Sequence, residues 1–104
     1  MSDPTSALIR ALRGGFSNFT VEQAESRSWA SGTFVGTRHK LIFRTEGDEA
    51  DASADTFLAD LTEAEFTLRG HILADIALIS DARSEGEAGP LARISLEALT
   101  VEDA

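Results

Sequence analysis

Two histidines and a nearby aspartate are the residues best suited to proton transfer in this sequence. His71 and Asp75 are four residues apart in a segment of alternating apolar residues, so a strand would carry both on one face. They would stand about 13 Å apart, so they need a group from a neighbouring strand to act together. Arg69 on the same predicted face and His39 on an earlier strand supply such groups. We therefore predict a ligand-binding cluster of these four residues on an open sheet face, with Trp29 beside it.

Each of these residues also has a purely structural interpretation. His71 and Asp75 suit a half-buried polar face in which the aspartate makes an ion pair across the sheet. His39 lies within the segment Arg38-His39-Lys40, which suits a solvated strand end or an edge strand protected by charge, as well as an anion-binding corner. Trp29 has only small neighbours. It is either a ligand wall, a hot spot for a partner, or a core residue packed over a glycine.

Composition removes several kinds of chemistry. The chain has no Cys, which excludes disulfides, thiolate nucleophiles and cysteine-bound zinc. The acidic segment 46–55 lacks the spacing of a calcium-binding loop, so we predict a solvated loop there. No phosphate-binding glycine loop, nucleophile elbow or zinc-protease motif occurs. We expect no metal and no cofactor, and the sequence does not decide whether the chain is an enzyme.

The charge of the chain is strongly acidic and unevenly distributed. The net charge is -9, which disfavours nucleic acid and anionic membrane surfaces as partners. Residues 1–46 carry about +2 and residues 47–104 about -11, an asymmetry that can join the two halves or steer one copy onto another. Residues 1–10 do not have the pattern of a signal peptide, and no apolar run approaches the ~20 residues of a membrane span. We expect a cytoplasmic protein.

Hydrophobic spacing switches twice between the helical and the extended period. Helical spacing predicts helices over 4–14, which begins at Pro4, and over 53–65, capped by Asp51 or Ser53. Alternating spacing predicts strands over 19–35, 38–46, 66–82 and 91–101, with a turn at Gly36-Thr37 and a bulge near Leu99.

These elements predict one α+β domain over residues 1–104. The order is α-β-β-α-β-β, and it indicates a four-stranded antiparallel sheet with two helices on one face. The two helix-plus-hairpin halves suit either an internal duplication or a chance likeness. The predicted core consists of Leu8, Leu12, Leu41, Phe43, Phe57, Leu61, Leu68, Ile72, Ile76, Ile94 and Leu96.

Both predicted faces of the third strand are largely apolar, although a solvated antiparallel strand should alternate cleanly. The two helices can cover only one of these faces. We therefore predict a non-catalytic module that associates with itself or with another protein, most simply as a homodimer through Leu73, Ala77 and Ile79. The alternative is a small-molecule-binding protein or minor enzyme that uses the His/Asp/Arg cluster on the same face.

Overall fold

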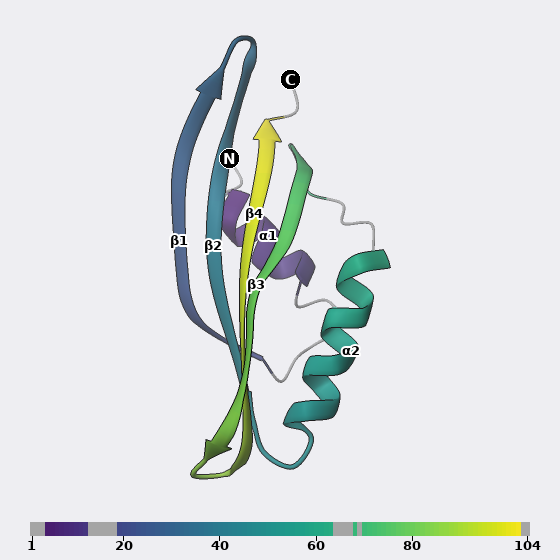
Figure 1. Cartoon of the computed structure of the whole chain (residues 1–104). Coiled ribbons are helices and arrows are strands. Elements are labelled where there is room, and N and C mark those ends of the chain that lie inside the picture. Colours follow the sequence, from purple (N-terminus) through teal and green to yellow (C-terminus); the bar gives the residue numbers. More distant parts are fainter. Residues whose placement is uncertain (1–3, 13–18, 64–67, 69, 103–104) are drawn as a thin grey trace.

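The computed structural model describes residues 4–12, 19–63, 68 and 70–102. Two helices and four strands follow one another as α1 (Pro4–Leu12), β1 (Thr20–Ser31), β2 (Phe34–Glu46), α2 (Ala50–Glu63), β3 (His71–Gly86) and β4 (Gly89–Glu102). All strand pairs are antiparallel, and both helices cover the same face of the sheet (Figure 1). The predicted fold class is confirmed.

The strand order is β1-β2-β4-β3, so each hairpin supplies one central strand and one edge strand. Pairing between β2 and β4 extends only from Gly36 to Glu46 along β2 and from Leu91 to Val101 along β4. The tips of the two hairpins therefore project beyond the shared part of the sheet, at opposite ends of the molecule (Figure 1). This makes the molecule long, with extents of 47 × 23 × 21 Å.

Three phenylalanine rings form the centre of the core between the sheet and α2. The ring of Phe57 on α2 lies 5.1 Å from that of Phe19 and 5.7 Å from that of Phe43, and Phe19 meets Phe43 edge to face. Aromatic rings in these tilted and edge-on arrangements add attraction to the area that they bury. The aliphatic residues around them come from both helices, both central strands and the segment before β3, and include Leu8, Leu12, Leu41, Ala54, Leu61, Leu68, Ile94 and Leu96.

The prediction that Ile72 is a core residue is wrong. Ile72 is 53% exposed, and Ile76 is only half-buried against the core. The cause is a bulge: Leu73 pairs with Thr100, and Asp75 already pairs with Leu99, so one extra residue is inserted in β3. Such an insertion reverses which side chains face inward. Leu73 therefore packs against the core instead of lying on the open face, and the irregularity predicted near Leu99 belongs to the facing strand.

Several predicted boundaries also move, and β3 extends to Gly86, beyond its predicted end at residue 82. The first hairpin turns at Gly32-Thr33, where Gly32 has a φ of 58°, and not at Gly36-Thr37. Helix α2 begins at Ala50, whose N–H donates to the carbonyl of Gly47 at 3.0 Å. The helix therefore begins before both predicted capping residues, Asp51 and Ser53. Strand β3 begins at His71 after a turn at Gly70, which has a φ of 77°. The predicted ends at 13–14 and 64–67 lie outside the described residues.

The phenylalanine cluster makes a direct test of the core. Replacing Phe57, which is 2% exposed, with Ala should lower the free energy of unfolding by about 3–5 kcal/mol, because it leaves a cavity beneath the sheet. The exposed Ile72→Ala should change the stability by less than about 1 kcal/mol. Urea unfolding followed by circular dichroism measures both. Equal losses in the two variants would contradict this assignment of the faces.

Candidate interaction surfaces

His39 is a buried structural residue and does not belong to a surface site. Its side chain is fully buried beneath α1. The ring Nδ1 lies 3.1 Å from Thr5 Oγ1 on α1, and Nε2 lies 2.9 Å from Thr100 Oγ1 on β4. Because the Thr100 hydroxyl donates to the carbonyl of Thr37, it accepts from Nε2–H, which leaves Nδ1 to accept from Thr5. The predictions of a solvated strand end and of an edge strand are wrong, since β2 is a central strand.

The predicted His–Asp cluster is not brought together. The bulge at Ala74 puts His71 in phase with Leu73 on the helix side, whereas Asp75 pairs with Leu99 on the opposite face. Arg69 lies outside the described residues. Within the described ranges no group of three metal-ligating side chains gathers.

Trp29 packs over a glycine, as one of its three interpretations proposed, but it is half-buried on the face of the sheet opposite the helices and is not a core residue. It pairs with Gly36 across the β1–β2 hairpin. A Cβ added at Gly36 would lie 2.8 Å from Trp29 Nε1 and 2.1 Å from the carbonyl oxygen of Thr100. The indole therefore occupies the space that the missing side chain leaves. In the described part of the chain, the buried Nε1 has no hydrogen-bond partner.

The face of the sheet opposite the helices, called the outer face here, is charged at its centre. Glu22 on β1 accepts two hydrogen bonds from Arg93 on β4, at 2.7 and 3.0 Å. Arg44 on β2 lies between them, 4.0 Å from the Glu22 carboxylate. The hydrogen bond from Arg93 lowers the pKa of Glu22 and raises that of Arg93. This bridge across three strands accounts for both arginines without a ligand.

Further along the outer face, the sheet forms a groove of about 580 Å³. Arg27 and Arg38 face each other directly across the β1–β2 pair, and Lys40 is the next outward residue on β2. Like charges placed opposite each other on neighbouring strands repel. We call it the basic groove because three cations line it. Its complete lining is Glu25, Ser26, Arg27, Arg38, Lys40 and Glu97.

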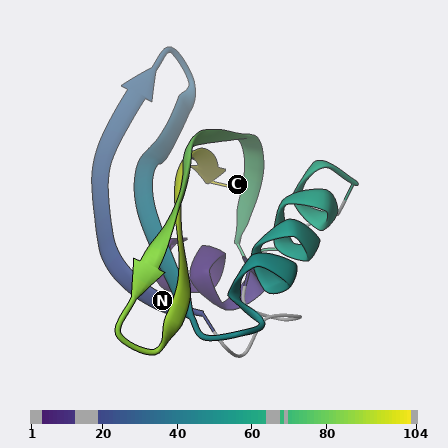
Figure 2. The ribbon, with the colours of Figure 1, turned by 60° about the horizontal axis from the view of Figure 1, so that its bottom comes forward.

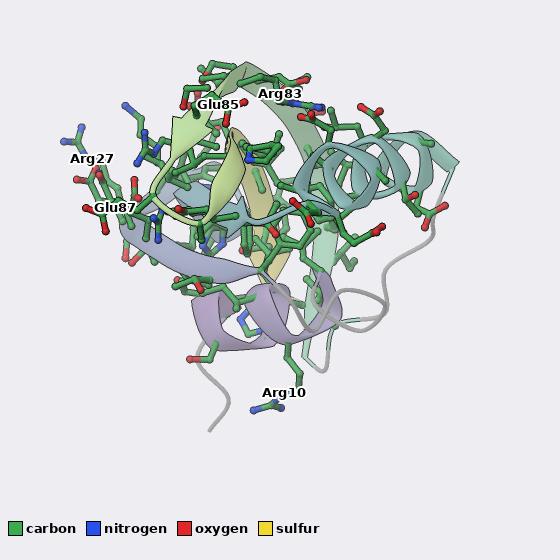
Figure 3. The ribbon with its side chains drawn as sticks, turned by 90° about the horizontal axis from the view of Figure 1, so that it is seen from below. Arg10, Arg27, Arg83, Glu85 and Glu87 are labelled. Atoms are coloured by element: carbon green, nitrogen blue, oxygen red, sulfur yellow. The ribbon has the colours of Figure 1, made fainter. Side chains whose placement is uncertain are left out.

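The opposite end of the molecule is acidic. Arg83 on β3 is held by Asp51, Asp55 and Asp81 at 2.6–3.0 Å, which raises the pKa of the guanidinium. Beyond it, Glu85 and Glu87 extend from the β3–β4 hairpin, while Arg10 on α1 points away on another side (Figure 3).

The large exposed apolar side chains of the described residues lie on edge strand β3 and at the tip of the β1–β2 hairpin. Ile72, Leu78 and Ile79 lie on edge strand β3 and are 47–59% exposed. Phe34 and Val35 lie at the β1–β2 tip and are 61% and 47% exposed. Of the predicted interface residues, Ala77 and Ile79 are exposed and Leu73 is not.

Sequence reasoning missed the basic groove. Arg27 and Arg38 are equidistant from the turn at Gly32-Thr33, so a correctly placed turn would have set them opposite each other. The predicted turn at Gly36 concealed this pairing.

No protein-family description matches the chain, and no curated protein matches it. Among solved structures, the fold is similar to a chain in the virion of a native gene transfer agent particle. The two chains have a TM-score of 0.56 and 15% sequence identity, and the match covers 93% of this chain and 86% of that chain. At this level of identity, the likeness supports the fold alone. No helix in the described segments is long and apolar enough to cross a lipid bilayer.

The Glu22 bridge predicts a pH-dependent stability. A carboxyl group whose pKa is lowered on folding stabilises the folded protein at any pH above its ordinary pKa of 4.5. This contribution is lost as the pH falls through the lowered pKa. Glu22→Gln should therefore have a lower Tm than the wild type at pH 7, and the difference should shrink as the solution is acidified below pH 4.5. In an Arg93→Leu background the same substitution should have a smaller effect. A Tm difference that does not change with pH would contradict the bridge.

The packing of Trp29 over Gly36 is equally open to test. Gly36→Ala should destabilise the chain by about 1–3 kcal/mol, because the new methyl group collides with the backbone of β4 and displaces the indole. Trp29 is the single tryptophan, so its emission should shift to longer wavelength as it becomes hydrated. Ser28→Ala, an exposed neighbour, serves as the control. An unchanged emission and Tm in Gly36→Ala would refute this packing.

Proposed function

We propose that this chain is a non-catalytic subunit that associates with copies of itself and with other proteins in a larger assembly. The observation that carries the proposal is the exposure of Ile72, Leu78 and Ile79 along edge strand β3. Soluble monomers rarely leave large apolar side chains grouped on an edge strand, because such edges promote association.

A contact at the β3 edge would be made by side chains rather than by backbone hydrogen bonds. Strand β3 carries two bulges, between Leu73 and Asp75 and between Leu78 and Ser80. Bulges interrupt the regular row of backbone groups that a further strand would need, and they redirect side chains. Ile79 lies within the second bulge and is 59% exposed. An apolar contact centred on Ile79 therefore fits this edge better than strand addition.

The simplest assembly that covers this edge is a homodimer. Two-fold symmetry would place the same apolar group of both copies in one interface. The surface differs from the predicted one: Ala77 and Ile79 stay in it, Ile72 joins it, and Leu73 leaves it for the core. Leu78 is exposed, but it pairs with the buried Leu96 and so lies on the helix side of the strand.

Association with other proteins has support from the fold. The similar chain belongs to the virion of a native gene transfer agent particle. The uneven charge of this chain, about +2 in one half and -11 in the other, provides complementary surfaces for such packing. A small-molecule site has less support, because His39 is enclosed in the core and Asp75 lies on the opposite face from His71.

Replacement of Ile79 by Lys tests the proposal. In high salt, which weakens contacts between charged groups, light scattering coupled to gel filtration should give a dimer mass for the wild type and a monomer mass for Ile79→Lys, with the Tm retained, because a lysine cannot be buried in an apolar contact. Ala52→Lys on α2 adds the same charge at an exposed site. It should associate like the wild type. A monomeric wild type at high micromolar concentration would overturn the proposed function.

A further inference from the structure

The basic groove holds more positive charge than its own carboxylates neutralise directly. Glu97 lies 3.6 Å from Arg38, and Glu25 accepts a hydrogen bond from Gln23 at 2.7 Å. No carboxylate in the described segments lies within 4 Å of Arg27 or Lys40. An added carboxylate between Arg27 and Arg38 would relieve their repulsion and accept charge-assisted hydrogen bonds from both guanidinium groups.

The tip of the β3–β4 hairpin presents carboxylates of this kind. Glu85 and Glu87 are exposed on either side of Gly86, and neither has a cation within ion-pair distance in the part of the chain that the structure describes. The tip itself is held in place, because the N–H of Ala88 donates to Glu46 Oε2 at 2.7 Å and Glu46 is paired with Arg44. The two carboxylates are therefore carried on a braced projection, which reduces the entropy lost on binding.

The groove and the tip are too far apart to meet within one copy. They belong to the hairpins that project from opposite ends of the long axis (Figure 1), and Figure 2 shows the same separation from another side. Seen along this axis, however, Arg27 and Glu87 lie on the same side of the molecule (Figure 3). A second copy displaced along the axis would bring its acidic tip to the basic groove of the first.

We propose that the basic groove of one copy binds the acidic β3–β4 tip of a second copy. Arg27 and Arg38 hold Glu87, whereas Lys40 lies opposite Glu25 on β1 and Glu97 on β4 and contributes less. This inference rests on the proposed function, because it names a second contact by which the subunit assembles. The net charge of -9 opposes association only weakly at this site, since charges more than about 8 Å apart are screened at physiological ionic strength.

The two surfaces in this contact are different, and that has a consequence for the size of the assembly. A two-fold contact closes at two copies, whereas a head-to-tail contact leaves a free groove and a free tip that can bind further copies. Together with the β3 contact, it predicts species larger than a dimer, which high salt should dissociate to dimers.

The test exchanges the charges of the two partners. Arg27→Glu and Glu87→Lys should each weaken the head-to-tail contact at least about tenfold and yield dimers, as judged by light scattering and sedimentation velocity. A mixture of the two variants should recover larger species, because the reversed charges attract again. Arg10→Glu on α1 and Asp60→Lys on α2 make the same charge changes at exposed positions away from both surfaces. These controls should assemble like the wild type, and circular dichroism should confirm that every variant is folded.

The outcomes separate the two proposals. Dimers that become larger species only when groove and tip carry opposite charges support this contact. A wild type that stops at the dimer, or larger species that survive both Arg27→Glu and Glu87→Lys, would overturn the head-to-tail contact and leave the β3 contact intact. A monomeric wild type would overturn the proposed function and this inference with it.

Discussion

The packing of two short helices against one face of a four-stranded sheet is the constraint on which the rest of this structure depends. Phe57 packs α2 against Phe43 of β2 and Phe19, which precedes β1. Helix α1 covers His39. This covers one face, and no third helix in the described residues covers the other. The outer face therefore has to be stable in water. It achieves this with charged residues that pair across strands, such as Glu22 with Arg93.

The bulges of β3 decide where the remaining apolar surface goes. Without the extra residue at Ala74, Ile72 would face the helices and Leu73 the solvent. The bulge reverses them, which completes the core with Leu73 and leaves Ile72 outside. The same irregularity makes β3 a poor template for a further strand. An edge that is apolar in its side chains but irregular in its backbone favours a specific side-chain contact over open-ended sheet growth.

Part of the separation of charge along the chain becomes a separation in space. The basic groove on the outer face of the β1–β2 hairpin holds Arg27, Arg38 and Lys40, whereas the first turns of α2 and the end of the β3–β4 hairpin hold Asp51, Asp55, Asp81, Glu85 and Glu87. The hairpins point in opposite directions (Figure 1), so the molecule has a basic region toward one end and an acidic region toward the other. The internal ion pairs of Arg83 neutralise part of the acidic end but not its tip.

The sequence by itself determined the class and order of the elements and most of the core. Hydrophobic periodicity is a local property, so the switch from helical to alternating spacing was readable around Phe19 and again in the third strand. The register of β1 against β2 could not be predicted from the sequence, because it depends on which of two glycines makes the turn. Gly32 adopts the positive φ, and Gly36 instead makes room for Trp29.

Only the tertiary structure decided the candidate surfaces. The pairing of Arg27 with Arg38 follows from the position of the turn, and the exposure of Ile72 follows from one inserted residue in β3. The burial of His39 depends on α1 and β4, which are distant in sequence and supply the hydroxyl groups of Thr5 and Thr100. The local spacing of residues cannot reveal a bulge or a hydroxyl group that is distant in sequence, because both act through contacts that exist only after the sheet has formed.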